Sequence, residues 1–398
     1  MRASAAFVIS RFSTMKLVLF ANTDWYLWNF RRSLALASRD AGFDLLLLSP
    51  PGTYGKKFGE IGLRWETVPM NRRSLNPLRE ARTVLHLARI LRRERPDLVH
   101  GFTIKCAVYG SLASNLAGVG ARVNAITGLG YVFTSDDAKA RTLRPLVRNL
   151  LRLALDGQES RLILQNPDDL AMVQDAGLVD PGRVCLIPGS GVDCTRFAPV
   201  VRVPRLPGQP MRVVLPARLL WDKGVAEFVE AARLLRSNGR EIEFLLAGEA
   251  DAGNPATVPE AAIRGWINEG LVSWLGHVDD MPGLFASVDV VVLPSYREGL
   301  PRSLIEAGAC GLPLVTTDVP GCREVVEDGV DGLLVPVCDA KALAVAVARL
   351  HDNPSLAARL GAGARAKALA RFDERIVVAR TMAVYSEILG ANYAFAKD

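Results

Sequence analysis

Short apolar segments of the strand type alternate with longer helical segments along most of this 398-residue chain. In the first half we expect strands near residues 16–21, 43–48, 65–69, 97–101, 122–126, 160–165 and 183–187. Between most of them we expect helices, near 29–41, 76–95, 105–118, 139–155 and 167–176. Strands that alternate with helices form parallel sheets covered on both faces. The first half therefore predicts an open α/β domain.

A proline-rich stretch separates this set from a second one. The run 198–210 contains four prolines and has neither a helical nor an alternating period, so it predicts a linker. Further strands are expected near residues 212–216, 242–247, 271–275, 289–294, 313–317 and 332–335, with helices between them. Two such domains leave a cleft, and ligands of open parallel sheets bind beyond the carboxyl ends of the strands.

The domain boundaries follow from these patterns. We expect a first Rossmann-like domain at 15–198, a linker at 199–211 and a second Rossmann-like domain at 212–372. A C-terminal helix at 373–390 is expected to pack back on the first domain. Residues 1–14 precede Met15-Lys16-Leu17, which reads like a true start, and we interpret them as a leader or the result of a misplaced start codon.

Composition narrows the class of protein. The chain is 49% hydrophobic, enough for sizeable cores, yet no apolar run reaches the roughly 18 residues of a membrane helix. None of its six cysteines forms a C-x-x-C pair, so neither a zinc site nor a disulfide framework is implied. We expect a reduced cytoplasmic protein without a bound metal.

The net charge of +6 is concentrated in the first half, much of it in the predicted helix 76–95. Arg82, Arg89 and Arg93 share one face of this helix at helical spacing, and apolar residues share the opposite face. The cationic face is either simply solvated or contacts an anionic membrane surface. Nucleic acid is not expected as a partner, because no basic motif with interleaved aromatic residues occurs.

The stretch 294–317 carries the strongest indication of a site. An apolar strand ends at Leu293, a loop containing Gly299 follows, and a helix opens near Arg302. Ser303 is predicted to cap that helix, whose start favours an anion such as phosphate. Glu298 in the loop and Glu306 inside the helix can accept from sugar hydroxyls. Alternatively, the two carboxylates are solvated or favour the positive helix end.

Three other loops follow strands of the same predicted sheet. The first carries Arg218, whose guanidinium is a forked donor, and Lys223, whose ammonium is a mobile point charge. Two such cations suit a diphosphate, although they also form ion pairs on surface loops. The second loop begins Gly248-Glu249. The third begins Gly276-His277-Val278, in which His277 is most simply a solvent-facing polar residue.

These residues resemble the donor domain of glycosyltransferase family 4, the retaining enzymes of two-domain GT-B architecture. The resemblance covers residues 15–390, since the first half also fits. Its motifs there are Asn22-Thr23-Asp24-Trp25-Tyr26, Asn29-Phe30-Arg31, His100-Gly101-Phe102-Thr103-Ile104-Lys105, Tyr109-Gly110-Ser111, Thr127-Gly128-Leu129-Gly130-Tyr131-Val132-Phe133 and Gly191-Val192-Asp193. They are similar to the bacterial branch that extends undecaprenyl-diphosphate-linked saccharides for O-antigen, capsule or glycoprotein assembly.

The resemblance implies a role for each donor-side residue. Arg218 and Lys223 would hold the nucleotide diphosphate of a UDP-sugar and stabilise leaving-group charge, Glu298 would bind the transferred sugar, and Glu306 would accept from the ribose. Main chain near Gly248 and Val278 would meet the nucleotide. The backbone lining the sugar and distal phosphate would come from Gly299, Leu300, Pro301, Arg302 and Ser303. Arg218, Lys223 and Glu298 are thus the candidate catalytic residues.

On the acceptor side the chain departs from the family. Its first loop contains Asp24, Trp25 and Tyr26 where many relatives have glycines, so Trp25 and Tyr26 are candidates to cover a sugar or lipid. Phe102 stands where many relatives carry a second histidine after the one matching His100. A core position and a catalytic role for His100 both stay open. The remaining acceptor-side candidates are Lys105, Gly128 and Gly130, and the two glycines can equally form a tight structural turn.

Together these patterns predict a retaining, metal-independent transfer of a hexose or N-acetylhexosamine from a nucleotide-sugar to a lipid-diphosphate-linked saccharide. The nucleotide-sugar is a substrate, so no cofactor is expected, and the Asp-x-Asp metal anchor of the other large glycosyltransferase fold does not occur. Cytoplasmic location, with peripheral contact to the inner face of the membrane, would suit this reaction. A sugar-nucleotide epimerase and a non-catalytic sugar-binding protein of the same architecture remain alternatives.

Overall fold

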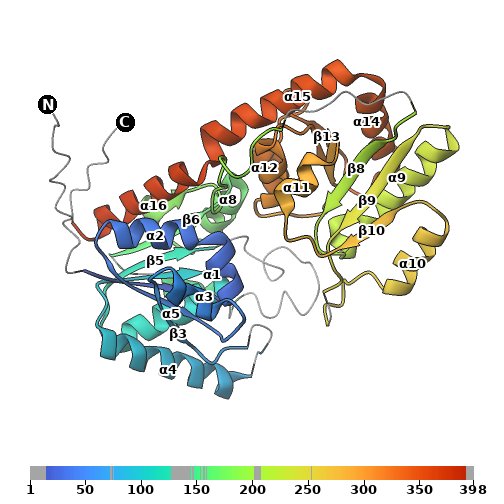
Figure 1. Cartoon of the computed structure of the whole chain (residues 1–398). Helices are drawn as coiled ribbons and strands as arrows, with labels where there is room; N and C mark the ends of the chain where they lie inside the picture. The colour runs from blue at the N-terminus through green and yellow to red at the C-terminus, as the bar shows by residue number, and fades with distance from the viewer. Residues whose placement is uncertain are drawn as a thin grey trace, which may run out of the picture. The chain divides into compact units, whose positions relative to one another are not determined.

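The computed structural model describes residues 15–390 except 72, 73, 75, 127–144, 146, 147, 153, 156, 158, 201–207 and 252. The chain forms two compact units (Figure 1). The first unit is the chain up to Ser190 together with the part from Arg375 onward, and the second is Gly191–Glu374. Each unit is built on its own parallel sheet.

The first sheet has seven parallel strands in the order β3-β2-β1-β4-β5-β6-β7. They are β1 (Lys16–Phe20), β2 (Asp44–Ser49), β3 (Arg64–Thr67), β4 (Leu98–Phe102), β5 (Ala121–Ala125), β6 (Ser160–Leu164) and β7 (Val184–Leu186). Every strand expected in the first half is present within one or two residues. The prediction succeeds because these segments are apolar runs bounded by turn residues, which is typical of strands buried on both faces.

The helices of this unit are α1 (Asp24–Phe30), α2 (Arg32–Asp40), α3 (Gly55–Glu60), α4 (Pro77–Glu94), α5 (Ile104–Ala117), α8 (Pro167–Asp175) and α16 (Glu374–Ile388). The helix expected at 29–41 is divided, because Arg31 leaves the helical conformation at φ −129° and ψ 3°. The short helix α3 was not predicted, since six residues show no periodicity. Most of the helix expected at 139–155 lies outside the described residues.

The C-terminal helix α16 packs on the first sheet. Its residues Val377, Met382 and Tyr385 are buried in the apolar cluster that also contains Leu17 of β1 and Leu45 of β2. The polypeptide therefore returns to the first unit after completing the second one.

The second sheet has six parallel strands in the order β10-β9-β8-β11-β12-β13. They are β8 (Met211–Pro216), β9 (Ile242–Ala247), β10 (Ser273–Gly276), β11 (Val290–Leu293), β12 (Leu314–Thr317) and β13 (Leu333–Val335). The helices are α9 (Val225–Ser237), α10 (Glu260–Asn268), α11 (Met281–Ala286), α12 (Arg302–Ala309), α13 (Pro320–Val325), α14 (Ala340–Asp352) and α15 (Pro354–Lys367).

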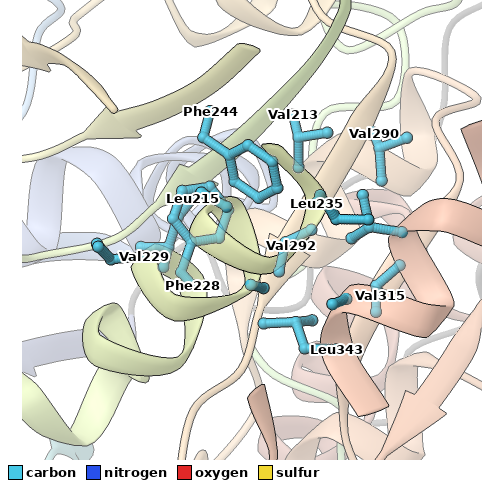
Figure 2. Close-up of a cluster of buried hydrophobic side chains, with 14 of the residues drawn as sticks. Val213, Leu215, Phe228, Val229, Leu235, Phe244, Val290, Val292, Val315 and Leu343 are labelled. Carbon is cyan, nitrogen blue, oxygen red and sulfur yellow. The ribbon is translucent and has the colours of Figure 1, made fainter. Parts of the chain in front are cut away.

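Apolar side chains fill the space between this sheet and the helices on its faces. In the cluster drawn in Figure 2, Phe228 of α9 and Phe244 of β9 lie with their ring centroids 4.9 Å apart. Val292 of β11 and Leu343 of α14 belong to the same cluster, and all four are almost fully buried. This packing makes the sheet a rigid base for the loops at its carboxyl edge.

The two units divide between Ser190 and Gly191, which is before the linker expected at 199–211. Residues just after the division belong to the second unit through backbone hydrogen bonds: the Val192 amide donates to the Phe372 carbonyl at 2.9 Å. The Arg365 guanidinium also donates to the carbonyls of Cys194 and Phe197. Such long-range contacts leave no periodic signal in the sequence.

In each sheet the strand order reverses at one point, between β1 and β4 and between β8 and β11. Loops that follow the two strands on either side of such a point diverge to opposite faces of the sheet and leave room for a ligand at its carboxyl edge. The predicted donor residues follow β8, β9, β10 and β11. Among the predicted acceptor residues, those of the first loop follow β1, His100 lies within β4, Lys105 follows β4, and the two glycines come after β5.

Candidate active site at the carboxyl edge of the second sheet

Glycines bring the loops of the second sheet into direct backbone contact. At Gly224, after β8, an added Cβ would lie 2.1 Å from the carbonyl oxygen of Pro294, after β11. At Gly248, after β9, it would lie 1.9 Å from the carbonyl oxygen of Ala217. Gly224 also has φ +73°, which L-residues with side chains rarely adopt. The loops after β8, β9 and β11 therefore form one packed unit that tolerates no side chain at these glycines.

Hydrogen bonds reinforce the contact between the loops after β8 and β11. The Tyr296 amide donates to the Asp222 carbonyl at 2.9 Å, and the Tyr296 hydroxyl donates to Glu227 of α9 at 2.8 Å. Burial and the Glu227 carboxylate raise the pKa of Tyr296, so the phenol stays protonated and keeps this bond. The segment 294–298 is thereby held against the start of α9.

Lys223 and Glu298 form an ion pair across the strand-order reversal. Lys223 Nζ lies 2.5 Å from Glu298 Oε1, and the same oxygen accepts from Ser295 Oγ at 2.8 Å. Both charged side chains are largely buried, with 16% and 13% of their surfaces exposed. Because they lie 75 positions apart in the sequence, only the fold brings them together.

Arg218 is placed differently. Its guanidinium is 57% exposed and pairs with Asp251, in the loop after β9, at 2.7 Å. Both predicted cations thus lie at the carboxyl edge of the second sheet, and each already has a carboxylate partner. The structure shows the ion pairs that were stated as the alternative for Arg218 and Lys223.

The start of α12 lies in the same group of loops. The prediction that Ser303 caps this helix is wrong: Pro301 occupies the N-cap position, no side chain caps the helix, and Ser303 is inside its first turn. Gly299, in the loop before α12, packs against α13, because a Cβ added at Gly321 of α13 would lie 2.4 Å from the Gly299 carbonyl oxygen. The α12 start therefore presents backbone rather than a capping side chain, with Leu300 partly buried beside it.

Glu306 lies inside α12 with 12% of its side chain exposed, and it pairs with Arg302 one turn earlier, at 2.7 Å. Burial raises the pKa of Glu306 in spite of Arg302 and of the more distant charge of Arg196. Glu298 and Glu306 therefore have separate cationic partners. This arrangement does not resemble a carboxylate pair that shares a proton.

The remaining predicted donor residues lie on the outer strands of the same edge. The Gly248 carbonyl accepts from the indole of Trp274 in β10 at 2.8 Å, which ties the loop after β9 to the next strand. Val278, after β10, is partly buried against the core. His277 is exposed, and its Nε2 lies 3.2 Å from Asp279 Oδ1. This agrees with its interpretation as a polar loop residue.

The edge of the second sheet thus combines two cations, two separately paired carboxylates and an uncapped helix start. Such a set can bind a polyhydroxylated anion and stabilise negative charge on a leaving group. Within the described part of the chain, no group of three or more His, Cys, Asp or Glu side chains is arranged to hold a metal ion. No helix of that part is long and apolar enough to cross a membrane.

In the first unit, the residues after β1 have mixed surroundings. Asp24 is buried and its carboxylate accepts from the chain's own backbone, at the amides of Trp25, Tyr54 and Gly55. Trp25 is 43% exposed, and Tyr26 packs partly against the core. Of these three candidates, Trp25 is the one whose side chain is most accessible to an acceptor.

The candidates on and after β4 are also engaged within the protein. His100 is buried, and its Nδ1 lies 2.6 Å from the Tyr385 hydroxyl of α16. Burial, with a smaller effect of Arg31, keeps the pKa of His100 well below its ordinary value. Lys105 pairs with Glu80 at 2.9 Å. Gly128 and Gly130 lie outside the described residues.

Sequence reasoning gave no role to several residues that the structure places at these sites. Ser295 and Asp251 hold the two donor-side ion pairs, and Arg31 lies buried beside Phe102 in the first unit. None of them stands out by spacing. Arg31 stands directly before Arg32 in the sequence, so its charge alone gave no signal.

Comparison with known families matches both units. Residues 210–353 match the family described as "Glycosyl transferases group 1", and residues 16–166 match the one described as "Glycosyl transferase 4-like". The two matches include β8 to β13 and β1 to β6, respectively.

Curated relatives extend the match to nearly the full chain. The chain is 28% identical, over 94% of its length and 99% of the relative, to the N,N'-diacetylbacillosaminyl-diphospho-undecaprenol alpha-1,3-N-acetylgalactosaminyltransferase of Campylobacter jejuni. It is 26% identical, over 73% of its length and 75% of the relative, to the UDP-Gal:alpha-D-GlcNAc-diphosphoundecaprenol alpha-1,3-galactosyltransferase of Escherichia coli.

Solved structures show the same architecture. Sucrose-phosphate synthase from Thermosynechococcus elongatus superimposes with a TM-score of 0.77 at 19% identity, over 94% of this chain and 100% of that one. The lipopolysaccharide glycosyltransferase WaaG superimposes with a TM-score of 0.70 at 17% identity, over 94% and 100%. With both units matched by family and the sheets matched by fold, the chain is a glycosyltransferase of family 4 with the GT-B architecture.

Proposed function

We propose that this enzyme transfers a hexose or N-acetylhexosamine from a UDP-sugar to a saccharide linked to undecaprenyl diphosphate, with retention of anomeric configuration and without a metal ion. The observation that carries this proposal is the Lys223–Glu298 pair at the strand-order reversal of the second sheet. It is supported by the two relatives described above, which are named for transfer to diphosphoundecaprenol-linked sugars. Products of this kind are intermediates of surface polysaccharides and glycoprotein glycans.

The donor occupies the loops described above. Arg218 and Lys223 bind the diphosphate, and main chain at Gly248 and Val278 meets the nucleotide. Glu306 accepts from the ribose hydroxyls and Glu298 from hydroxyls of the transferred sugar. Backbone of 299–303 surrounds the sugar and the distal phosphate, with Pro301 contributing no N–H. The existing carboxylate partners of both cations hold them in place before the donor arrives.

Chemistry then proceeds by front-face displacement. The bond between the anomeric carbon and the phosphate oxygen breaks as an oxocarbenium-like sugar forms. The acceptor hydroxyl oxygen then bonds to the anomeric carbon from the face that the diphosphate leaves, and the departing phosphate oxygen takes the hydroxyl proton. No side-chain nucleophile is required. Lys223, Arg218 and the start of α12 stabilise charge on the departing diphosphate, which is the effect expected of preorganised donors in a partly buried site.

The lipid-linked acceptor places the enzyme at the cytoplasmic face of the membrane, and α4 is the surface we assign to it. Arg82 and Arg89 are exposed on this helix, and so are Leu78 and Leu85, with 73% and 48% of their surfaces accessible. Arg93, which we expected on the same face, instead pairs with Glu66 and Glu94. Exposed leucines beside unpaired arginines are typical of a helix that lies on an anionic bilayer.

Glu298→Gln tests the donor assignment. Transfer from UDP-N-acetylhexosamine or UDP-hexose to a short-chain polyprenyl-diphosphate saccharide should fall by about 100-fold, because glutamine lacks the negative charge and has a donor NH2 in place of one acceptor oxygen at the reacting sugar. UDP affinity should change little. Glu260→Gln, on the exposed side of α10, is the matched control. Near-full activity of the Glu298 variant would refute the assignment, and isomerised donor formed without acceptor would identify an epimerase instead.

Co-sedimentation tests the membrane surface. Replacing Arg82 and Arg89 by Gln and Leu78 and Leu85 by Ser should reduce binding to vesicles containing phosphatidylglycerol. Arg233 and Arg264 of the second unit, both largely exposed, provide a control with the same loss of charge. Equal binding by the α4 variant and the wild type would leave α4 as a solvated face.

A further inference from the structure

Arg31 is a buried cation in the first unit. It lies between α1 and α2 with 5% of its surface exposed. Its guanidinium carbon sits 4.4 Å from the centre of the Phe102 ring, and one terminal nitrogen donates to the Tyr26 hydroxyl at 3.0 Å. Its Nε is buried and has no acceptor, and no carboxylate of the described residues pairs with the guanidinium.

Burial of the Arg31 guanidinium without a carboxylate partner lowers the stability of the fold. Arginine keeps its charge inside proteins, so Arg31 cannot escape burial by losing a proton. A buried charge is stable only when it is paired and hydrogen-bonded. Stacking on Phe102 and one bond to a phenol satisfy a small part of a group with five N–H donors. The position is therefore built for an anion that the protein's own described side chains do not supply.

Two further polar groups nearby have no partner. Thr103 Oγ1, in the residue after Phe102, is buried without a hydrogen bond, and Thr103 has φ +75°, a conformation rarely adopted by a β-branched residue. His100, whose ring centroid is 4.0 Å from that of Phe102, has an unpartnered Nε2. Arg31 and His100 therefore both lie against the Phe102 ring at the end of β4, and Thr103 is the next residue of the chain.

The tautomer of His100 adds a donor. The Tyr385 hydroxyl is fully buried, and burial raises its pKa, so it keeps its proton. His100 Nδ1 is its partner at 2.6 Å, so the phenol donates to Nδ1 and the neutral ring carries its own hydrogen on Nε2. Nε2–H is then a buried donor without an acceptor, like the Nε–H of Arg31.

The position of the cluster in the fold favours a ligand. Phe102 ends β4 and α5 begins at Ile104, while α1 and Arg31 follow β1, so the cluster lies at the strand-order reversal of the first sheet. Ligands of open parallel sheets bind at such points, and the 14-residue helix α5 starts there without a side-chain cap. The neighbouring cation Lys105 is paired with Glu80. Among the described residues of this cluster, Arg31 is therefore the cation without a carboxylate partner.

We propose that Arg31, with Thr103 and His100, forms a binding site for phosphate oxygens in the first unit, and that the group bound there is the diphosphate of the lipid-linked acceptor. The forked guanidinium of arginine matches a phosphate with two parallel hydrogen bonds. That the diphosphate comes from the acceptor rests on the proposed function. The existence of an anion site rests on the geometry alone.

Thermal unfolding of the whole enzyme tests the anion site first. Inorganic pyrophosphate, added in the presence of saturating UDP, should raise the Tm of the wild type by several degrees, because a ligand that binds the native state stabilises it. Arg31→Gln should lose this rise, whereas Arg32→Gln, which removes an exposed guanidinium from the adjacent residue, should keep it. Without pyrophosphate, Arg31→Gln should unfold at the same or a higher temperature than the wild type.

Steady-state kinetics then identify the source of the anion. In Arg31→Gln, KM for a short-chain polyprenyl-diphosphate saccharide should rise by about tenfold or more with KM for the UDP-sugar unchanged. A fall in UDP affinity with unchanged acceptor KM would overturn the acceptor assignment. An equal pyrophosphate response in Arg31→Gln and the wild type would overturn the site. Arg31→Met is the second variant, should the glutamine variant fold poorly.

These outcomes separate this site from the proposed function. If the wild type binds pyrophosphate through Arg31 but transfers no sugar to any lipid diphosphate, the anion site stands and the acceptor assignment fails. If transfer occurs with normal acceptor KM in both Arg31 variants and these variants respond to pyrophosphate like the wild type, the proposed function stands and the Arg31 site is refuted.

Discussion

Gly224→Ala should damage the active site without touching any charged group. Gly224 follows Lys223, and a Cβ added there would lie 2.1 Å from the Pro294 carbonyl oxygen, where ordinary contact begins at 3.4 Å. The loops after β8 and β11 would have to move apart by more than about 1 Å, a displacement that typically costs about 100-fold in rate. Lys223 and Glu298, 2.5 Å apart across this junction, would separate with them.

The loss of stability and activity expected for Gly224→Ala can be compared with that of a matched substitution. Gly239, after α9, has nearly the same backbone conformation, with φ +71°, but an added Cβ meets nothing within 4 Å. Gly239→Ala should therefore lose only the penalty of the left-handed conformation, about 1–2 kcal/mol. Gly224→Ala should lose about 1–3 kcal/mol more from steric overlap, and its activation barrier should rise by about 2.7 kcal/mol.

Urea unfolding and kcat/KM for sugar transfer, measured on both variants, separate strain from displacement. Gly239→Ala should keep near wild-type kcat/KM while Gly224→Ala loses about two orders of magnitude. If the two variants had equal stability and equal kcat/KM, the close approach of the two loops would have no functional role, and the argument that glycines build this site would be refuted.

Two further substitutions probe the charges of the site. Lys223→Met should lower the free energy of unfolding, because the largely buried Glu298 loses its cation. Adding Glu298→Gln to this variant should restore about 1–3 kcal/mol of that free energy. If the effects of the two substitutions in urea unfolding were strictly additive, the pairing would be contradicted. Burial raises the pKa of Glu306, so its contribution to stability is complete below its unfolded pKa and is lost as pH rises through the folded pKa. In Glu306→Gln, the free energy of unfolding should decline less steeply above about pH 4.3 than in the wild type. The same variant should bind UDP about tenfold more weakly. If the pH dependence of its unfolding free energy matched that of the wild type, the burial argument would be contradicted.

The sheets were predictable from sequence because their strands are local apolar runs. The order of strands and the reversals at β1/β4 and β8/β11 follow from pairing between distant segments, which no local pattern encodes. The helix expected at 29–41 is interrupted at Arg31, which leaves the helical conformation and packs on Phe102, a residue distant in the sequence. Local periodicity therefore predicted the element and missed its break.

The residues of the candidate donor site were named from sequence, but their contacts were not. Glu298 pairs with Lys223 and Glu306 with Arg302, while the separate roles expected for the two carboxylates stay predictions. Ser303 was predicted as a helix cap from residue type alone, and Pro301 takes that place.

On the acceptor side, the carboxylate of Asp24 serves the amides of Tyr54 and Gly55. This partnership spans thirty residues, and residue type or spacing could not have revealed it.

The anomeric configuration of the product tests the central claim most directly. The enzyme would be incubated with a UDP-α-sugar, a short-chain polyprenyl-diphosphate saccharide and a chelator, and the new linkage determined by proton NMR. The account predicts an α-linked product formed at the same rate with and without the chelator. A β-linked product, or a rate that depends on added metal, would contradict the retaining, metal-independent transfer assigned to the loops around Lys223 and Glu298.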